Sequence, residues 1–200
     1  MAIPTNFNHP KKGSNIRVEP IRKLEDIKSI KKLLQDQPRN LLLFTLGINN
    51  GLRIGDLLQL KVRDIQYLKS GDALQVKEKK TGKENFLLIN KTSGKALKLY
   101  LDSYRPDSES FVFRSQKNKY QPITVSYSNQ LIKSWCRQIN LTGNYGTHTL
   151  RKTFGYIQRV YYGVGYEILC KRYNHSSPAV TMRYLGIEDK EISGFLMNEI

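Results

Sequence analysis

The stretch THTLRKTF, residues 147–154, places an imidazole and a guanidinium three residues apart between apolar positions. Side chains three apart on a helix share one face, so His148 and Arg151 are predicted to project side by side. A guanidinium beside an imidazole can bind a phosphate through charge-assisted hydrogen bonds. The H-x-x-R spacing is common by chance, so evidence from other segments of the chain is needed to show that these residues form a site.

A second polar segment follows downstream. The sequence NHSS occupies residues 174–177, and Tyr184 comes nine residues after His175. One tyrosine among 12 carries no weight by itself. Its fixed distance from this histidine makes Tyr184 a candidate nucleophile.

Two upstream segments add cations and a carboxylate. In GLRIGDLL, residues 51–58, a glycine ends one helix and Arg53 begins the next, where its guanidinium can bind two phosphate oxygens. Asp56 lies three residues on and can orient a neighbour. KKTGK, residues 79–83, is predicted to form a turn between two strands that carries a lysine toward DNA. Taken alone, a surface Arg–Asp pair and a solvated basic turn explain these segments equally well.

Together the four segments offer what cleavage of a phosphodiester needs: a nucleophile, cations for the non-bridging oxygens and a proton donor for the leaving oxygen. Their order resembles the tyrosine recombinase, or phage integrase, family over residues 20–195. The family patterns G-L-R-x-x-E-L, H-x-L-R-x-T-F and L-G-H-S-S with a tyrosine nine residues after the histidine are matched at residues 51–57, 148–154 and 174–184. The lysine that the family carries before a Gly-Lys turn is matched by Lys80.

The resemblance implies a site-specific recombinase that cleaves and rejoins DNA without a metal or other cofactor. By this resemblance Tyr184 is the nucleophile, which forms a 3′-phosphotyrosyl bond. Arg53 and Arg151 hold the non-bridging oxygens of the scissile phosphate, and Lys80 is the general acid for the 5′-oxygen.

The same resemblance gives the two histidines their roles. His148 contacts the phosphate and accepts the tyrosine proton, and His175 supports phosphate binding. An ordinary tyrosine is neutral at pH 7, so attack needs a base or a strongly positive pocket.

Three positions depart from the family pattern or leave its alignment open. Asp56 stands where the family has glutamate, and its shorter arm is expected to orient Arg53 or His148. Asn174 replaces a glycine, and asparagine also tolerates the left-handed backbone that this turn requires. Lys79 adjoins Lys80, so the general acid can be shifted by one residue.

The charge of the chain favours a polyanionic partner. Lysine and arginine number 33 against 17 acidic residues, which gives a net charge of +16. Double-stranded DNA fits this excess, and a ribosome-associated factor is the plainer alternative. The sequence contains no apolar run of about 20 residues and no secretory h-region, so we expect a cytoplasmic protein, bacterial or phage-encoded. Cys136 and Cys170 are expected to be reduced thiols.

The pattern of apolar residues predicts an α+β, mostly helical domain with a small three-stranded antiparallel sheet. Residues 1–18 are predicted to be a flexible N-terminal arm, and residues 19–200 the catalytic domain. The predicted strands are 62–67, 73–79 and 84–89. The predicted helices are 19–37, 41–48, 53–60, 96–104, 126–139, 148–162, 166–173, 178–185 and 188–200.

Members of the family usually carry a separate core-binding domain of about 80–100 residues before the catalytic domain. This chain has only its short arm there, so we expect an intact small protein, with an excised fragment as the alternative. We also expect a monomer in solution and a homo-tetramer on paired DNA sites. The final helix is predicted to dock its apolar face, and docking on its own domain and docking on a neighbouring subunit both stay open.

Three other kinds of protein are alternatives to this assignment. A type IB topoisomerase shares the chemistry, but its motifs are less close to these. A non-catalytic DNA-binding protein with a decayed site is disfavoured because all six site residues are present. A zinc protein using Cys136, His148, Cys170 and His175 lacks the close ligand pairs that zinc sites show.

Overall fold

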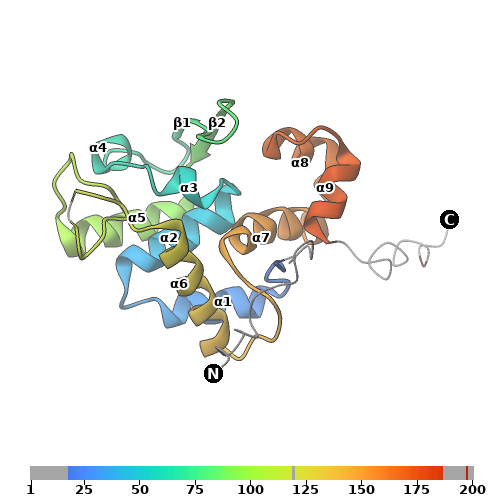
Figure 1. Ribbon diagram of the computed structural model, residues 1–200, viewed down its shortest axis with the longest axis horizontal. Coiled ribbons are helices and arrows are strands. Elements are labelled where there is room, and N and C mark those ends of the chain that lie inside the picture. Colours follow the sequence, from blue (N-terminus) through green and yellow to red (C-terminus); the bar gives the residue numbers. More distant parts are fainter. Residues whose placement is uncertain (1–17, 119, 187–196, 198–200) are drawn as a thin grey trace, which may run out of the picture.

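The structure is a computed structural model, and it describes residues 18–118, 120–186 and 197 (Figure 1). The described residues are mostly helical and include one small sheet. The helices are α1 (Leu24–Leu33), α2 (Pro38–Asn50), α3 (Ile54–Leu57), α4 (Val62–Ile65), α5 (Lys91–Tyr104), α6 (Val125–Gln138), α7 (Thr147–Val160), α8 (Tyr166–Tyr173) and α9 (Pro178–Leu185). The strands are β1 (Ala73–Lys77) and β2 (Glu84–Leu88).

Helix α2 lies at the centre of the domain and packs against α5 and α7. Its buried side chains include Leu42, Phe44 and Leu46, which are fully enclosed in the main core. Pro38 occupies its first turn, where proline has no hydrogen bond to lose. The helix ends at Gly51, whose φ of 60° is left-handed, as the sequence predicted.

The first helix is shorter than predicted. It was expected to begin at Glu19 and Pro20, but α1 begins at Leu24. The backbone N–H of Glu19 donates to the carbonyl of Asn144, and that of Ile21 donates to the Thr153 hydroxyl. These long-range bonds hold the segment in an irregular conformation.

The sheet has two antiparallel strands, so the predicted third strand is wrong. β1 pairs with β2, with Ala73 opposite Leu88 and Lys77 opposite Glu84. The segment expected to be a strand, residues 62–67, forms α4 instead. The Asp64 carboxylate accepts the N–H of Lys61 and so stabilises the first turn of α4. Val62 and Ile65 are three residues apart and both buried, which is helical spacing.

Helices α8 and α9 form a pair at one side of the domain, and α9 packs against α7 (Figure 1). The close approach depends on Gly155 of α7. A Cβ at this position would overlap the Tyr173 hydroxyl and lie 2.7 Å from a methyl group of Leu185. Tyr173 and Leu185 are fully buried, so neither has room to move.

The predicted arm and the predicted final helix lie outside the described residues, except for residues 18 and 197. The division of the chain at residue 18 and the docking of the C-terminal segment therefore remain predictions. Within the described part of the chain, no helix has the length and apolar character needed to cross a bilayer.

Replacing Gly155 by alanine is expected to destabilise the fold. Helix propensity favours alanine by about 1 kcal/mol, but the added methyl would displace Tyr173 from its 2.7 Å hydrogen bond to the Arg151 carbonyl. Overpacking of this kind costs about 1–3 kcal/mol, or roughly 2–10 °C in Tm for a domain of this size. Gly55→Ala is the matched control, because no atom lies within 4 Å of a Cβ built there. Equal melting temperatures for the two variants would contradict this account.

Candidate active site

Five of the seven predicted site residues line one pocket of about 360 Å³ between the β1–β2 turn, α3 and the start of α7. These elements lie next to one another in Figure 1. The lining residues are Arg53, Ile54, Gly55, Asp56, Lys79, Lys80, Val125, Thr147, His148 and Arg151. Segments that are almost 100 residues apart in sequence therefore meet at one surface.

Tyr184 lies at the end of α9, next to this pocket. Its hydroxyl is 3.2 Å from Nδ1 of His148, and its ring makes edge contacts with His175 and Tyr173. Burial raises the pKa of Tyr184 to about 12, although Arg151 and Arg53 oppose the rise. The hydroxyl is thus neutral near pH 7 in the DNA-free protein.

His148 stands in the first turn of α7 and faces that hydroxyl. Lost hydration lowers its pKa, and the nearby cations, Arg151 foremost, lower it further. The imidazole is therefore neutral near pH 7. In the tautomer with its proton on Nε2, Nδ1 can accept a proton from Tyr184.

Arg151 is buried, and backbone carbonyls hold its guanidinium. Nη1 donates to the carbonyl of Gly51 at 2.7 Å, and Nη2 donates to that of Tyr173 at 2.8 Å. The guanidinium also lies over the Tyr173 ring, 4.6 Å from the centroid. This cation is fixed in place before any anion arrives.

Arg53 is held differently, by a carboxylate. It caps the N-terminus of α3, and its Nη1 forms an ion pair with Glu78. Its side chain is 21% exposed, whereas that of Glu78 is fully buried. Burial acts to raise the pKa of Glu78, but hydrogen bonds from Thr81, Arg53 and Asn85 outweigh it and lower the pKa to about 2.

In the described part of the chain, no hydrogen bond joins the Asp56 carboxylate to the side chain of Arg53 or His148, the residues that it was expected to orient. Its carboxylate accepts the backbone N–H of Lys79 at 2.9 Å, so it fixes the start of the basic turn. Lys79 and Lys80 are both exposed and both line the pocket. The geometry therefore leaves both lysines as candidates for the proton donor.

His175 lies beyond α8, directly after a left-handed residue. Asn174 has φ 56° and ψ 34°, so asparagine does supply the backbone that the family obtains from glycine. Nδ1 of His175 is 3.0 Å from the Thr181 hydroxyl, and the ring stacks at a tilt on Tyr173. Burial, with Arg151 and Arg53, lowers the pKa of His175 to about 4.

Sequence reasoning missed two residues of this site. Lys152 is buried, and its Nζ lies 5.1 Å from the centroid of the Tyr184 ring. Glu78 holds Arg53. A signal for Glu78 was present, because Leu74 and Val76 face inward on β1 and the alternation continues to residue 78.

The zinc alternative gains no support. The residues that the structure describes contain no group of three or more His, Cys, Asp or Glu placed to hold a metal ion. Burial raises the pKa of Cys136 to about 12, which disfavours the thiolate that zinc requires.

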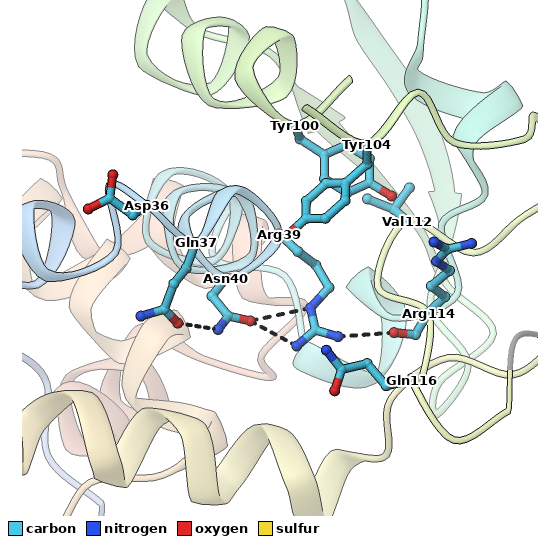
Figure 2. Close-up of a pocket in the computed structure, with 9 residues that line it drawn as sticks. All are labelled: Asp36, Gln37, Arg39, Asn40, Tyr100, Tyr104, Val112, Arg114 and Gln116. Atoms are coloured by element: carbon cyan, nitrogen blue, oxygen red, sulfur yellow. Dashed lines mark hydrogen bonds between the residues drawn. The ribbon is translucent and has the colours of Figure 1, made fainter. Parts of the chain in front are cut away.

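A separate pocket of about 250 Å³ lies between the start of α2, the end of α5 and the loop that follows α5 (Figure 2). Figure 2 shows the Arg39 guanidinium donating to Asn40 Oδ1 and to the Arg114 carbonyl, the latter at 3.1 Å. Asn40 in turn donates to Gln37 at 2.8 Å. Arg39 thus attaches this loop to α2, and no predicted site residue lines the pocket.

The fold and the site together define the catalytic domain of a tyrosine recombinase. The chain matches the phage integrase family over residues 18–191. It is 38% identical to "Probable integrase/recombinase YoeC" of Bacillus subtilis, over 86% of this chain and 91% of that protein. It is 29% identical to "Tyrosine recombinase XerA" of Pyrococcus horikoshii, over 82% of this chain but only 56% of that protein.

Solved structures show the same fold. A crystal structure of XerA recombinase superposes with a TM-score of 0.73 at 19% identity, covering 91% of this chain and 67% of that one. A lambda integrase dimer bound to a COC′ core site gives a TM-score of 0.63 at 20% identity, covering 94% and 52%. The chain belongs to the phage integrase family, as a site-specific recombinase of the tyrosine type.

The two site histidines are expected to titrate below the ordinary value of about 6.5, and His175 is expected to titrate near pH 4. The unfolded chain takes up these protons near pH 6.5, so the free energy of unfolding should fall as the pH drops from 6.5 toward 4. NMR titration of the imidazole Cε1–H signals measures both midpoints, with His148→Gln and His175→Gln to assign them. Midpoints at or above 6.5 would contradict the electrostatics described here.

Proposed function

We propose that this chain cleaves and rejoins double-stranded DNA through Tyr184. The observation that carries the proposal is the 3.2 Å contact between the Tyr184 hydroxyl and His148, beside a pocket lined by Arg53 and Arg151. A neutral nucleophile, a neutral base and two fixed cations are the groups that an in-line attack on a phosphodiester requires.

The step balances as follows. The bond between Tyr184 Oη and phosphorus forms while the bond between phosphorus and O5′ breaks, and the phenolic proton passes to His148 Nδ1. Lys80 gives a proton to the departing O5′, which leaves a 3′-phosphotyrosyl bond and a free 5′-hydroxyl. Attack by the 5′-hydroxyl of a partner strand reverses these transfers and rejoins the DNA.

The remaining cations act on the non-bridging oxygens. Arg53 and Arg151 neutralise the charge that develops there, since guanidinium groups suit phosphate geometry. His175 donates from Nε2. In this tautomer the proton is on Nε2 and Nδ1 accepts a hydrogen bond from the Thr181 hydroxyl. The distances support it, because that hydroxyl is 3.0 Å from Nδ1 but 3.5 Å from the Ser177 carbonyl, the other acceptor within its reach.

DNA as the substrate is supported by the net charge of +16 and by similar solved structures, one of which is a Tn1549 transposon integrase in complex with transposon right end DNA. Another is a XerH site-specific recombinase bound to a palindromic difH substrate. We propose further that four copies of this chain assemble on paired sites, because strand exchange joins ends from two duplexes. Cytoplasmic action and freedom from a metal requirement belong to the same proposal.

Tyr184→Phe is expected to abolish covalent attachment to DNA and to leave DNA binding nearly unchanged, because only the attacking hydroxyl is lost. The probe is a pool of nicked duplexes with a randomised centre. Cleavage releases a short fragment that carries the 5′-hydroxyl, and this fragment diffuses away. The strand then cannot be rejoined, so the covalent adduct accumulates. Adducts are counted on denaturing gels. Tyr67→Phe, at a side chain that is 82% exposed, is the matched control and should keep wild-type yield. An adduct formed by Tyr184→Phe would refute the proposal.

A duplex with sulfur in place of the bridging O5′ should identify the general acid. A thiolate leaves without protonation, so loss of the acid should slow cleavage of the oxygen substrate by about 10²-fold or more and spare the sulfur substrate. We expect this pattern for Lys80→Ala. Lys79→Ala and Lys83→Ala are compared in the same turn and should treat both substrates alike. If Lys79→Ala rather than Lys80→Ala slows only the oxygen substrate, the general acid is Lys79.

A further inference from the structure

Glu78 is an ionisable side chain in the site region to which the proposed reaction gives no role. It lies just after β1 and is fully buried. Three side chains bind its carboxylate: Arg53 by an ion pair, the Thr81 hydroxyl at 2.6 Å and the Asn85 amide at 3.1 Å. Both carboxylate oxygens are thus engaged, and the group has a single well-determined position.

The anchorage of Glu78 extends to the other side of the site. Asn85, its partner on β2, accepts from Nη1 of Arg172 in α8 at 2.6 Å. The same guanidinium donates to the Asn50 carbonyl at the end of α2, at 2.6 and 3.0 Å. A chain of hydrogen bonds therefore joins the phosphate-facing Arg53 to helices α2 and α8.

The position of Glu78 also fixes the basic turn. Thr81, which binds its carboxylate, directly follows Lys80. The Glu78 carbonyl accepts the N–H of Gly82 at 2.8 Å, and its own N–H donates to the Lys83 carbonyl at 2.9 Å. One residue thus contacts both the arginine that faces the phosphate and the turn that carries the lysines.

Electrostatics alone argues against a carboxylate at this place. A negative charge beside a pocket that binds phosphate weakens DNA binding. A buried ion pair also gains little net stability, because both partners lose hydration. The arrangement is explained if its benefit is geometric, since a misplacement of about 1 Å can cost 10²-fold in rate.

We propose that Glu78 is a positioning residue, which holds the Arg53 guanidinium and the Lys80 turn in one fixed arrangement for phosphoryl transfer. The inference rests on the proposed function. It assigns Glu78 no contact with the DNA and no proton transfer.

The test is Glu78→Gln, which keeps the size and the hydrogen-bonding oxygen but removes the charge. Single-turnover adduct formation should slow by about tenfold or more. DNA binding, measured with Tyr184→Phe in the background, should stay equal or tighten because one negative charge is gone. A slower cleavage rate together with equal or tighter DNA binding indicates a positioning role. A general electrostatic effect would not slow cleavage while binding tightens, and loss of folding would weaken both.

The control is Glu109→Gln, which removes the same charge from an exposed carboxylate paired with Arg63 and Lys61 away from the site. It should leave the cleavage rate unchanged. A double variant provides the second measurement: Glu78→Gln should slow Arg53→Lys much less than it slows the wild type, because the two residues act as one unit. A wild-type rate in Glu78→Gln, or fully additive effects, would overturn the role of Glu78.

Thr81→Val covers the case in which Glu78→Gln does not fold. Thr81 is exposed, so its hydroxyl can be removed without a cavity in the core. Thr81→Val should still cleave the sulfur substrate severalfold more slowly than the wild type, although this substrate needs no proton donor. The reason is that Glu78, without the Thr81 hydrogen bond, holds Arg53 less firmly. Full speed on that substrate would overturn the proposal. Absence of any adduct from the unchanged protein would instead overturn the proposed function itself.

Discussion

The burial of the Arg151 guanidinium is the interaction on which the site depends. Its Nη1 donates to the carbonyl of Gly51, in the first family-pattern segment, and its Nη2 donates to the carbonyl of Tyr173, directly before the third segment. An unpaired buried cation is costly, so these carbonyls and the Tyr173 ring have to be in place when the domain folds. One side chain thereby brings three distant segments to a common point.

The burial of each group is the main cause of the protonation states around the pocket, and the charge of Arg151 is the next. Arg151 contributes to the lowered pKa of both histidines, and it partly offsets the raised pKa of Tyr184. Tyr184 and His148 are consequently neutral near pH 7, and Arg151 keeps its positive charge beside them. Such preorganisation needs no rearrangement of dipoles at the moment of reaction.

Local sequence patterns predicted several features of the candidate site, because these features depend only on residues close together in the sequence. The helical spacing of His148 and Arg151 and the left-handed backbone of Asn174 follow from residue type and position. The third strand was wrong because β-branched residues suggested a strand where the Asp64 cap and burial three residues apart favour α4. Glu78 was missed because its partner Arg53 comes from a separate segment, and no local pattern indicates which carboxylate pairs with Arg53.

The two arginines of the site are held by different means, and this has a consequence for the fold. Arg151 is held by backbone carbonyls, which stay in place whatever side chains surround them. Arg53 is held by a side chain, Glu78, which needs Thr81, Asn85 and, through Asn85, Arg172 for its own position. Arg53 is therefore held in place only if β1 and β2 pair in the observed register. A shift of this register by one residue would turn the side chain of residue 78 to the solvent face. The small sheet, which contributes little to the core, in this way determines the geometry of the candidate active site.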